Sequence, residues 1–533
     1  MKFVFANVFL LTAILLATGN LWGPLETSEA RYAEISREML VSGDWIHPTL
    51  LNIYHYHKPP VTYWITAAAY YMLGITPFAF RFFLVVALVI QFFIVVEISK
   101  MLLNDKESAR LAGYIYVTMP LVLASARGLT TDSYLMTFVL LSILCWIKLI
   151  EKQHVIFIYC CAISLGLAFL TKGPVALILP LTVILSLLKW RPLPPLKFWH
   201  WVLGLTIFLL ISTSWFLILV YENKEFIHYF LFNHTIERIT HAEVFSRSKP
   251  FYYYLLFLPV LALPWIVPFV FQLFKRTESR TIVKRIVLYW VGIPLLFFSA
   301  VSSKLPLYIL PLFPGISIVT ASYFTKNVLP RISIIFFVLN AIIGAALLYL
   351  ALCIFNNELT WKVFFSAVFI LGGSIIVYHV FSKNIALNAL VLVLITGLLI
   401  SSVFVFSSAY SYDVNTAALA RLLVEKRKQK EPVLVFDELL PSLAFHLNEV
   451  PVSVYNGSKS LHREVAFQKD SLWKNYFVNF TSSNGKERFR QFINNSAVIV
   501  VQKNKYNHLV PYLSDSYKAD SVGNRLIVYS VKK

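Results

Sequence analysis

Long apolar runs alternate with short polar loops along the first three quarters of the chain. A helix needs about 20 apolar residues to cross about 30 Å of hydrocarbon, so each run is a candidate membrane span. The runs occupy residues 3–21, 79–99, 111–126, 133–150, 155–170, 174–189, 200–221, 251–274, 286–302, 307–325, 332–355, 362–381 and 385–409. The pattern predicts an α-helical polytopic membrane protein with about 13 transmembrane helices. The first run also fits a signal peptide, but the charges of the loops favour a retained helix.

Every second polar loop is basic. These loops are residues 100–110, 148–154, 189–197, 275–285 and 326–331, together with Lys383. Lys and Arg concentrate in cytoplasmic loops, so we expect the N-terminus inside and the other loops outside. The two large outer loops are then residues 22–78 and 222–250. An odd number of spans also places the C-terminal segment on the outer side.

Two segments of the first outer loop predict amphipathic helices that lie on the membrane surface. In residues 28–43, Ile35 and Met39 recur at helical spacing, and a glycine ends the segment. The opposite face carries Glu34, Arg37 and Glu38. We expect this face to be solvated and linked by salt bridges. The second segment, residues 61–73, follows a Lys-Pro-Pro sequence.

The pattern changes after residue 409. Helix-period segments then alternate with short apolar runs that are typical of strands. The predicted helices are residues 416–430, 439–447 and 486–495, and the predicted strands are residues 432–436, 452–455, 497–501 and 525–531. We therefore predict a transmembrane domain over residues 1–409 and a small extracytoplasmic α/β domain over residues 410–533. The latter has no glycine-rich phosphate loop, which favours a non-catalytic cap or docking module.

Composition agrees with a membrane protein and argues against a nucleic-acid partner. The chain has 533 residues, of which 58% are hydrophobic and only 14% are charged, whereas soluble domains are about a quarter charged. The net charge of +20 comes largely from short loops between apolar runs, as the positive-inside rule predicts. The four cysteines, Cys145, Cys160, Cys161 and Cys353, all fall in apolar runs. They indicate neither a disulfide framework nor a zinc ribbon.

Several cations occur at the outer ends of predicted spans. Lys58 precedes two prolines, which fix an extended backbone and aim its ammonium group. Lys172 and Lys304 are each followed by a proline within two residues, and Arg127 lies at a similar membrane depth. A set of aimed cations at one depth suits a phosphate or diphosphate head group.

Two carboxylates have both a functional and a structural interpretation. Asp132 begins a span on the outer side, where a carboxylate indicates a functional site, although aspartate also caps helices. Glu29 either serves the site or interacts with the dipole of its helix from the first turn. The histidines of the outer loops, His55, His57, His234 and His241, offer zinc ligands, but their spacing is not a recognised metal motif.

Six stretches resemble a known family. They read ETSEARYAEISREMLVSGDW, YHYHKPPVTYW, TTDSYL, TKGP, FNHTIERI and SKLPLYILPLFP. They are similar to the bacterial polyprenyl-phosphate-sugar glycosyltransferases, and most similar to the lipid A aminoarabinose transferases within the protein-O-mannosyltransferase superfamily. The resemblance implies a GT-C fold and a multi-pass protein of the bacterial inner membrane. It also implies inverting sugar transfer from undecaprenyl phosphate on the periplasmic side.

The resemblance and the residues together suggest a set of site residues. The proposed catalytic residues are Glu29, Glu26 and Asp132, and Glu26 or Glu29 is expected to face the sugar C1. The phosphate of the donor is expected to lie among Lys58, Arg31, Lys172, Arg238, Arg247 and Lys304. His57 and His234 are the candidate zinc ligands.

The chain departs from the family at two of these positions. Ser28 stands where the family usually has aspartate, and Ser cannot act as a strong base. Either Glu26 takes that role, or the acceptor is an ionised phosphate that needs no base. His57 stands where the aminoarabinose transferases have a glutamate ligand, and imidazole still binds zinc.

The leading hypothesis is a glycosyltransferase that acts on a lipid A, protein or glycan acceptor. A protein O-mannosyltransferase-like enzyme is the nearest alternative. A transporter or flippase of lipid-linked glycans comes from another class, but such proteins often show paired repeats and midplane charges, and neither is visible here. A sensor with an outer ligand domain leaves the aimed cations unexplained.

Overall fold

The computed structural model describes residues 2–26, 28–188, 194–230, 248–274, 280–324, 416–428, 431–461, 465–468 and 471–531, with five isolated residues between 342 and 375. The chain divides into two compact units. Unit 1 comprises Met1–Thr18, His57–Val61 and Arg81–Val405, and unit 2 comprises Gly19–Tyr56, Thr62–Phe80 and Phe406–Lys533. The first outer loop and the C-terminal segment therefore belong largely to the same unit, although they lie far apart in the sequence.

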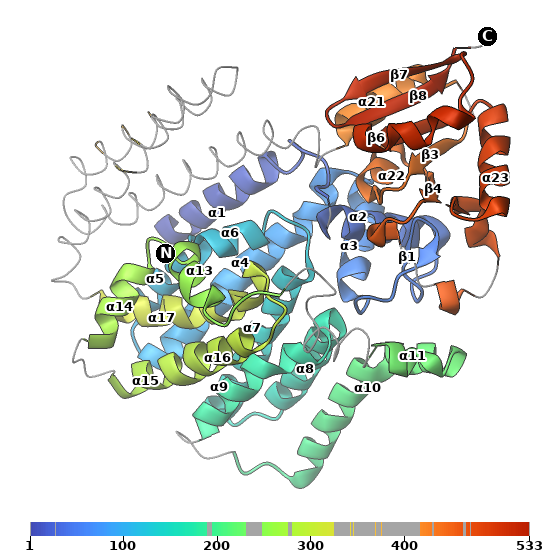
Figure 1. The fold of residues 1–533 in the computed structure, drawn as a ribbon. Coiled ribbons are helices and arrows are strands. Elements are labelled where there is room, and N and C mark those ends of the chain that lie inside the picture. Colours follow the sequence, from blue (N-terminus) through green and yellow to red (C-terminus); the bar gives the residue numbers. More distant parts are fainter. Residues whose placement is uncertain are drawn as a thin grey trace. The chain divides into compact units, whose positions relative to one another are not determined.

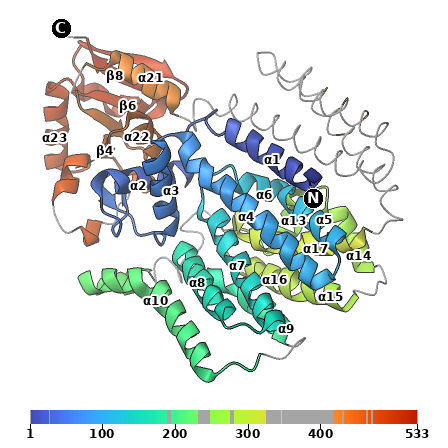
Figure 2. The ribbon, with the colours of Figure 1, turned by 180° about the vertical axis from the view of Figure 1, so that it is seen from behind.

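Unit 1 is helical (Figure 1). Its first elements are α1 (Lys2–Ala17), α4 (Pro77–Leu103), α5 (Lys106–Val117), α6 (Pro120–Ser125), α7 (Thr131–Lys152), α8 (Ile156–Lys172), η1 (Pro174–Leu177) and α9 (Ile178–Leu188). The later elements are α10 (Phe198–Glu222), α11 (Glu225–His228), α13 (Tyr253–Leu261), α14 (Ile266–Phe274), α15 (Arg280–Arg285), η3 (Ile286–Gly292), α16 (Ile293–Ala300), η4 (Pro306–Leu312) and α17 (Phe313–Tyr323). Helix α8 packs between α7 and α10 (Figure 2).

The described helices confirm a multi-pass membrane protein. Five are long and apolar enough to cross a membrane, and a bent pair adds a sixth candidate. Shorter apolar helices account for the predicted runs at 155–170 and 174–189. The runs at 332–355, 362–381 and 385–409 lie outside the described residues, so about 13 spans stays a prediction.

One predicted span is not a single straight helix. The run at 251–274 divides into α13 and α14, and the chain bends by 109° between them. Pro264 lies in the turn between them, where it lacks the backbone N–H that a continuous helix needs. The run therefore remains a candidate span, but it is bent at the proline.

Polar side chains inside unit 1 pair with one another. Gln91 of α4 donates to Thr137 at 2.8 Å and to the backbone oxygen of Ser133 at 2.8 Å. Its own side-chain oxygen accepts from the Tyr116 hydroxyl at 2.7 Å. Buried polar groups cost free energy unless they are paired. This network therefore fixes α4, α5 and α7 against one another.

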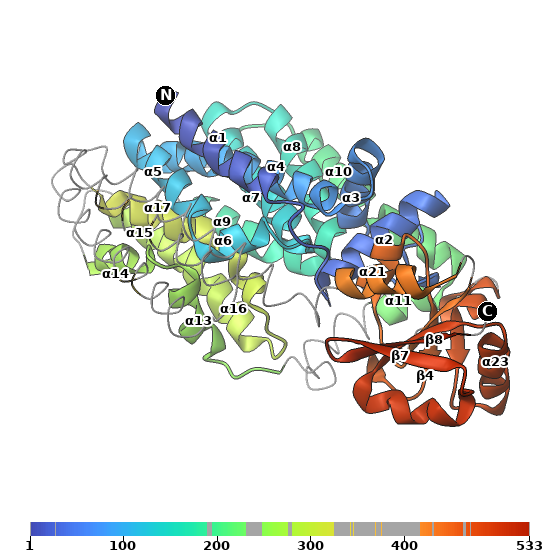
Figure 3. The same cartoon turned by 90° about the horizontal axis from the view of Figure 1, so that it is seen from above.

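The C-terminal part of unit 2 forms a six-stranded sheet in the order β5-β4-β3-β6-β8-β7. The strands are β3 (Val433–Phe436), β4 (Val452–Tyr455), β5 (Phe477–Asn479), β6 (Val498–Gln502), β7 (Tyr517–Val522) and β8 (Arg525–Ser530). The first four are mutually parallel, and β8 and β7 are antiparallel neighbours at one edge (Figure 3). The predicted α/β class is confirmed, but β5 and β7 were missed. Strand β5 has only three residues, and β7 is mostly polar because it forms an exposed edge.

Helices cover both faces of this sheet. Alternate residues of a strand point to opposite faces. Val433 and Val435 of β3 therefore pack with α21 (Ala417–Lys426) and α22 (Pro441–Leu447), whereas Leu434 and Phe436 pack with α23 (Ser483–Asn494).

The first-loop part of unit 2 contains α2 (Ser28–Ser42), the strands β1 (Thr49–Leu50) and β2 (Ile53–Tyr54), and α3 (Val61–Leu73). Both predicted helices are present, but the expectation of a solvated polar face on α2 was wrong. Glu34, Arg37 and Glu38 are 0%, 3% and 4% exposed. Helix α22 packs against α2, and the Arg37 guanidinium donates to Asn448 just beyond the end of α22. The polar face is therefore buried against the C-terminal fold, which the local pattern does not reveal.

Candidate active site

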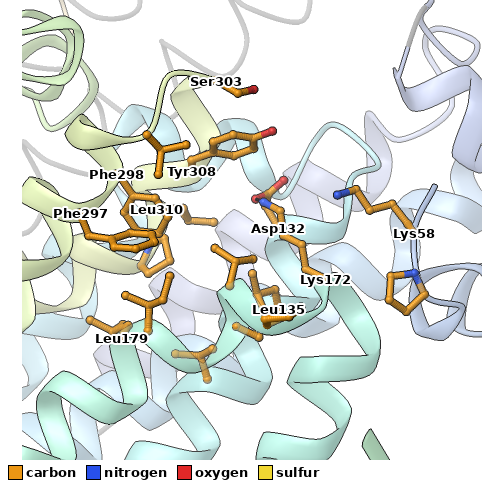
Figure 4. Close-up of a pocket in the computed structure, with 18 of the residues that line it drawn as sticks. Lys58, Asp132, Leu135, Lys172, Leu179, Phe297, Phe298, Ser303, Tyr308 and Leu310 are labelled. Carbon is orange, nitrogen blue, oxygen red and sulfur yellow. Dashed lines mark hydrogen bonds and ion pairs between the residues drawn. The ribbon is translucent and has the colours of Figure 1, made fainter. Parts of the chain in front are cut away.

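Unit 1 contains a cavity of about 380 Å³ that gathers three charged side chains (Figure 4). Lys58, Asp132 and Lys172 line it, together with His57 from the same segment as Lys58. The remaining lining is largely apolar and includes Leu135, Val139, Val175, Leu179, Phe297 and Phe298. The cavity thus offers a charged part beside a long apolar wall.

The backbone around Lys172 aims its side chain. Lys172 is the last residue of α8, and Gly173 follows with φ of 78° and ψ of −156°. This conformation is essentially restricted to glycine. Pro174 then starts η1, so the chain turns sharply after the lysine. The sequence TKGP therefore ends one helix and starts the next around an aimed ammonium group.

Asp132 pairs with this ammonium group. Its carboxylate accepts a hydrogen bond from Lys172 Nζ at 2.5 Å, and both side chains are about nine-tenths buried. The cap of α7 is Thr130, whose side chain accepts from the Asp132 backbone N–H. The alternative of a helix cap is therefore wrong for Asp132, because Thr130 has that role.

Tyr308 was missed by the sequence analysis. It lies in η4 and lines the cavity, and its ring centroid is 4.4 Å from Lys172 Nζ. A ring face at this distance attracts a cation. The signal lay in the stretch SKLPLY, where only the lysine was considered. Lys172 is thus held by a carboxylate on one element and by an aromatic ring on another.

Lys58 approaches the same point from a separate segment. Figure 4 shows its side chain directed toward the Asp132–Lys172 pair. The segment His57–Val61 belongs to unit 1, although the residues before and after it belong to unit 2. Two lysines and one carboxylate leave a local charge of about +1, which favours an anion in the cavity.

Two of the expected cations point elsewhere. Lys304 does not line the cavity, and its ammonium group donates to the backbone oxygens of Lys249 at 3.0 Å and Val301 at 2.5 Å. Arg127 donates to the backbone oxygen of Leu15 and to the Thr18 hydroxyl at the end of α1. Both side chains join backbone segments, so we assign them structural roles.

The expected carboxylates of the first loop lie in unit 2, as does Arg31. Glu29 is buried in the first turn of α2, and its carboxylate accepts from the Leu25 N–H at 2.9 Å. Glu26 accepts from the Ser442 N–H at the start of α22, at 2.8 Å. Burial raises the pKa of Glu26 to about 7. Arg238, Arg247 and His234 lie outside the described residues.

Of the two candidate zinc ligands, His57 lines the cavity and His234 lies outside the described residues, so zinc binding stays a prediction. Within the described part of the chain, no group of three or more His, Cys, Asp or Glu side chains is placed to hold a metal. His57 lines the cavity, but the nearby Asp132 is engaged by Lys172. No step below therefore passes through a metal.

The fold is of the GT-C type that the resemblance implies. A solved structure of ArnT from Cupriavidus metallidurans in the apo state superposes with a TM-score of 0.80 and covers 100% of this chain and 98% of that one, at 20% identity. The structure of the same protein bound to undecaprenyl phosphate superposes equally well, with a TM-score of 0.80.

Sequence comparison points in the same direction. Residues 1–230 match the family model described as dolichyl-phosphate-mannose-protein mannosyltransferase. The chain is 31% identical over 327 residues to undecaprenyl phosphate-alpha-4-amino-4-deoxy-L-arabinose arabinosyl transferase 2 of Proteus mirabilis. It is 30% identical over 327 residues to the corresponding transferase of Yersinia enterocolitica. The matched region spans 58% of the length of each of these relatives and 60% of this chain. The resemblance seen in the sequence motifs is thus confirmed.

Proposed function

We propose that this protein is an inverting glycosyltransferase of the bacterial inner membrane, with its active site on the periplasmic side. Its donor is a sugar carried on undecaprenyl phosphate, and its activity is most like that of the lipid A aminoarabinose transferases. The names of the relatives and the fold support this proposal. The structural observation that carries it is the pair of aimed lysines beside an apolar wall.

The charged part of the cavity suits the phosphate of a lipid-linked sugar, and its apolar wall suits the lipid. Lys58 and Lys172 supply donors for a phosphate, and charge-assisted hydrogen bonds of this kind are among the strongest in proteins. The apolar wall, with Leu179, Phe297 and Phe298, suits the first isoprene units of the carrier. A soluble sugar nucleotide would leave that wall unused.

The reaction can be written around these side chains. The acceptor oxygen forms a bond to the sugar C1 as the bond from C1 to the phosphate oxygen breaks on the opposite face. The electron pair of the broken bond stays on the departing undecaprenyl phosphate, which gains negative charge. Lys58 and Lys172 stabilise this charge, and Asp132 acts as a positioning residue that holds Lys172.

The acceptor decides whether a base is needed. The relatives favour a lipid A phosphate, which is already ionised and needs no strong base. The departure at Ser28 agrees with such an acceptor. Glu26 accepts from the N-terminus of α22, so we propose a structural role for it. Glu29 also accepts from a backbone N–H within unit 2, and its role as a site residue stays a prediction from the resemblance. The match to the mannosyltransferase family model keeps a protein hydroxyl as the second candidate acceptor.

The test is sugar transfer in proteoliposomes that contain an undecaprenyl-phosphate-linked aminoarabinose donor and lipid A. Lys58→Ala or Lys172→Ala should each lower turnover about tenfold to a hundredfold, because each removes a charge-assisted contact of about 1.5–3 kcal/mol. Lys100→Ala is the matched control, since Lys100 is half exposed at the last turn of α4 and should be replaced without loss. Full activity of both cavity variants in correctly inserted protein would contradict the proposal.

A further inference from the structure

Unit 1 contains a partly buried arginine, Arg285, away from the candidate active site. The Nη1 atom of Arg285 is buried and makes no hydrogen bond within the described part of the chain. An unpaired buried charge is costly, and an ion of opposite sign is the usual remedy. Arg285 lies at the end of α15, next to the π-helix η3. Short π-helical segments often occur at functional sites.

Arg285 faces a narrow crevice that is separate from the candidate active site. Four helical elements line it, namely the ends of α4, α7 and α9 and the α15–η3 segment. The lining is Leu102, Ile147, Val183, Ser186, Leu187, Ile282, Arg285, Ile286, Tyr289 and Trp290. None of these described residues is acidic. The interior volume is about 30 Å³, room for about one water molecule, so a ligand must lie along the mouth.

The depth of the crevice corresponds to one surface of the membrane. Arg285 is four residues into the apolar helix Thr281–Ala300, or about 6 Å from its start. Phe298 and Val301 at the other end of this helix line the cavity, so Arg285 marks the surface away from the candidate active site. At the same end of α4, Lys100 pairs with Glu97 at 3.4 Å, and the last turn of α7 carries both Glu151 and Lys152, so Arg285 is the cation that faces the crevice.

From these observations we infer an anionic-phospholipid site at this crevice. The phosphodiester of the lipid accepts from the Arg285 guanidinium, and an acyl chain lies along the apolar mouth formed by Leu102, Val183 and Leu187. Basic pockets between transmembrane helices are suited to such lipids. A soluble anion would gain nothing from the apolar lining.

Thermal unfolding of the full chain in a neutral detergent tests this inference, with phosphatidylglycerol, phosphatidylethanolamine or inorganic phosphate added. Phosphatidylglycerol should raise the Tm of the wild type, because a ligand that binds only the folded state stabilises it. Arg285→Met should bind phosphatidylglycerol about tenfold to a hundredfold more weakly and lose the shift. Without lipid, this variant should be at least as stable as the wild type, since it removes a buried nitrogen that has no hydrogen-bond partner among the described residues.

Lys284→Met is the matched control, because Lys284 is exposed and carries the same charge one residue away. It should keep the phosphatidylglycerol shift. If Arg285→Met fails to insert, Arg285→Gln takes its place and should lose the shift as well. An equal shift in the Arg285 variant and the Lys284 variant would overturn the inference. So would an equal response of the wild type to inorganic phosphate or to phosphatidylethanolamine.

Discussion

Lys172 owes its position to three neighbours that come from different parts of the chain. Gly173 ends α8 in a conformation that is essentially restricted to glycine. Asp132 accepts a hydrogen bond from the Lys172 ammonium group, and the ring face of Tyr308 lies against that group. A long lysine side chain loses considerable rotamer freedom when it is fixed. The neighbours hold it before the substrate arrives, so binding a phosphate orders little more of the protein.

The Asp132–Lys172 pair should therefore behave as a unit. Asp132→Asn removes the charge of the acceptor but keeps its shape, and we expect it to lower turnover about tenfold. Lys172→Gln should cost at least as much. Because both changes disrupt one contact, the double variant should be about as active as Lys172→Gln alone. Steady-state transfer rates of the four proteins give the coupling, and strictly additive losses would contradict a positioning role.

At the scale of elements, α22 joins the first outer loop to the C-terminal sheet within unit 2. It packs on α2, and its N-terminal Ser442 N–H donates to Glu26. The second carboxyl oxygen of Glu26 is buried with no hydrogen-bond partner in the described residues. Burial raises the pKa of this group from 4.5 to about 7, so the folded state favours the protonated form.

The packing of α22 should therefore depend on pH. The folded state binds the Glu26 proton more tightly than the unfolded state does. The stability that this proton contributes to the folded state is fully present below pH 4.5 and is lost as pH rises through about 7. The cost above pH 7 is about 3 kcal/mol at most. Glu26→Gln should remove this dependence and protect the α22 amides better than the wild type at pH 8. Glu487→Gln, at an exposed position, is the control. Hydrogen exchange of the full chain, corrected for intrinsic rates, measures the effect, and equal protection in all three proteins at pH 8 would refute it.

The elements also show what can be predicted from sequence. The segment 61–73 matches α3 (Val61–Leu73) because its helical pattern begins after two prolines. The bend between α13 and α14 and the mostly polar strand β7 were missed, since each depends on a local break or on an exposed edge. The burial of Glu34 and Arg37 could not be predicted, because it requires α22, about 400 residues away. The sequence predicted Lys58, Asp132 and Lys172 as site residues from their residue types and positions at span ends. That they line one cavity, and that the Tyr308 ring lies against Lys172, could be seen only in the folded structure.

At the scale of the whole molecule, charge asymmetry predicts orientation. The basic loops alternate along the chain, and the candidate active site lies at the start of α7 and the end of α8, away from the basic loop that joins these helices. The positive-inside rule then predicts that the cavity and the C-terminal sheet both face away from the cytoplasm.

Cysteine labelling tests this orientation. After replacement of Cys145, Cys160, Cys161 and Cys353 by alanine, single cysteines are introduced at the exposed positions Ser460 and Thr281. An impermeant maleimide should label Ser460→Cys in intact spheroplasts and should label Thr281→Cys only after lysis. The opposite pattern would reverse the proposed topology.

The central claim is that Lys58 and Lys172 bind the phosphate of a polyprenyl carrier. Titration of the purified full chain with undecaprenyl phosphate tests it without any assumption about the sugar or the acceptor. The account predicts that Lys58→Ala and Lys172→Ala each weaken binding about tenfold to a hundredfold, whereas Lys100→Ala binds as the wild type does. If both cavity variants are folded and bind undecaprenyl phosphate as tightly as the wild type, the cavity is not the donor site.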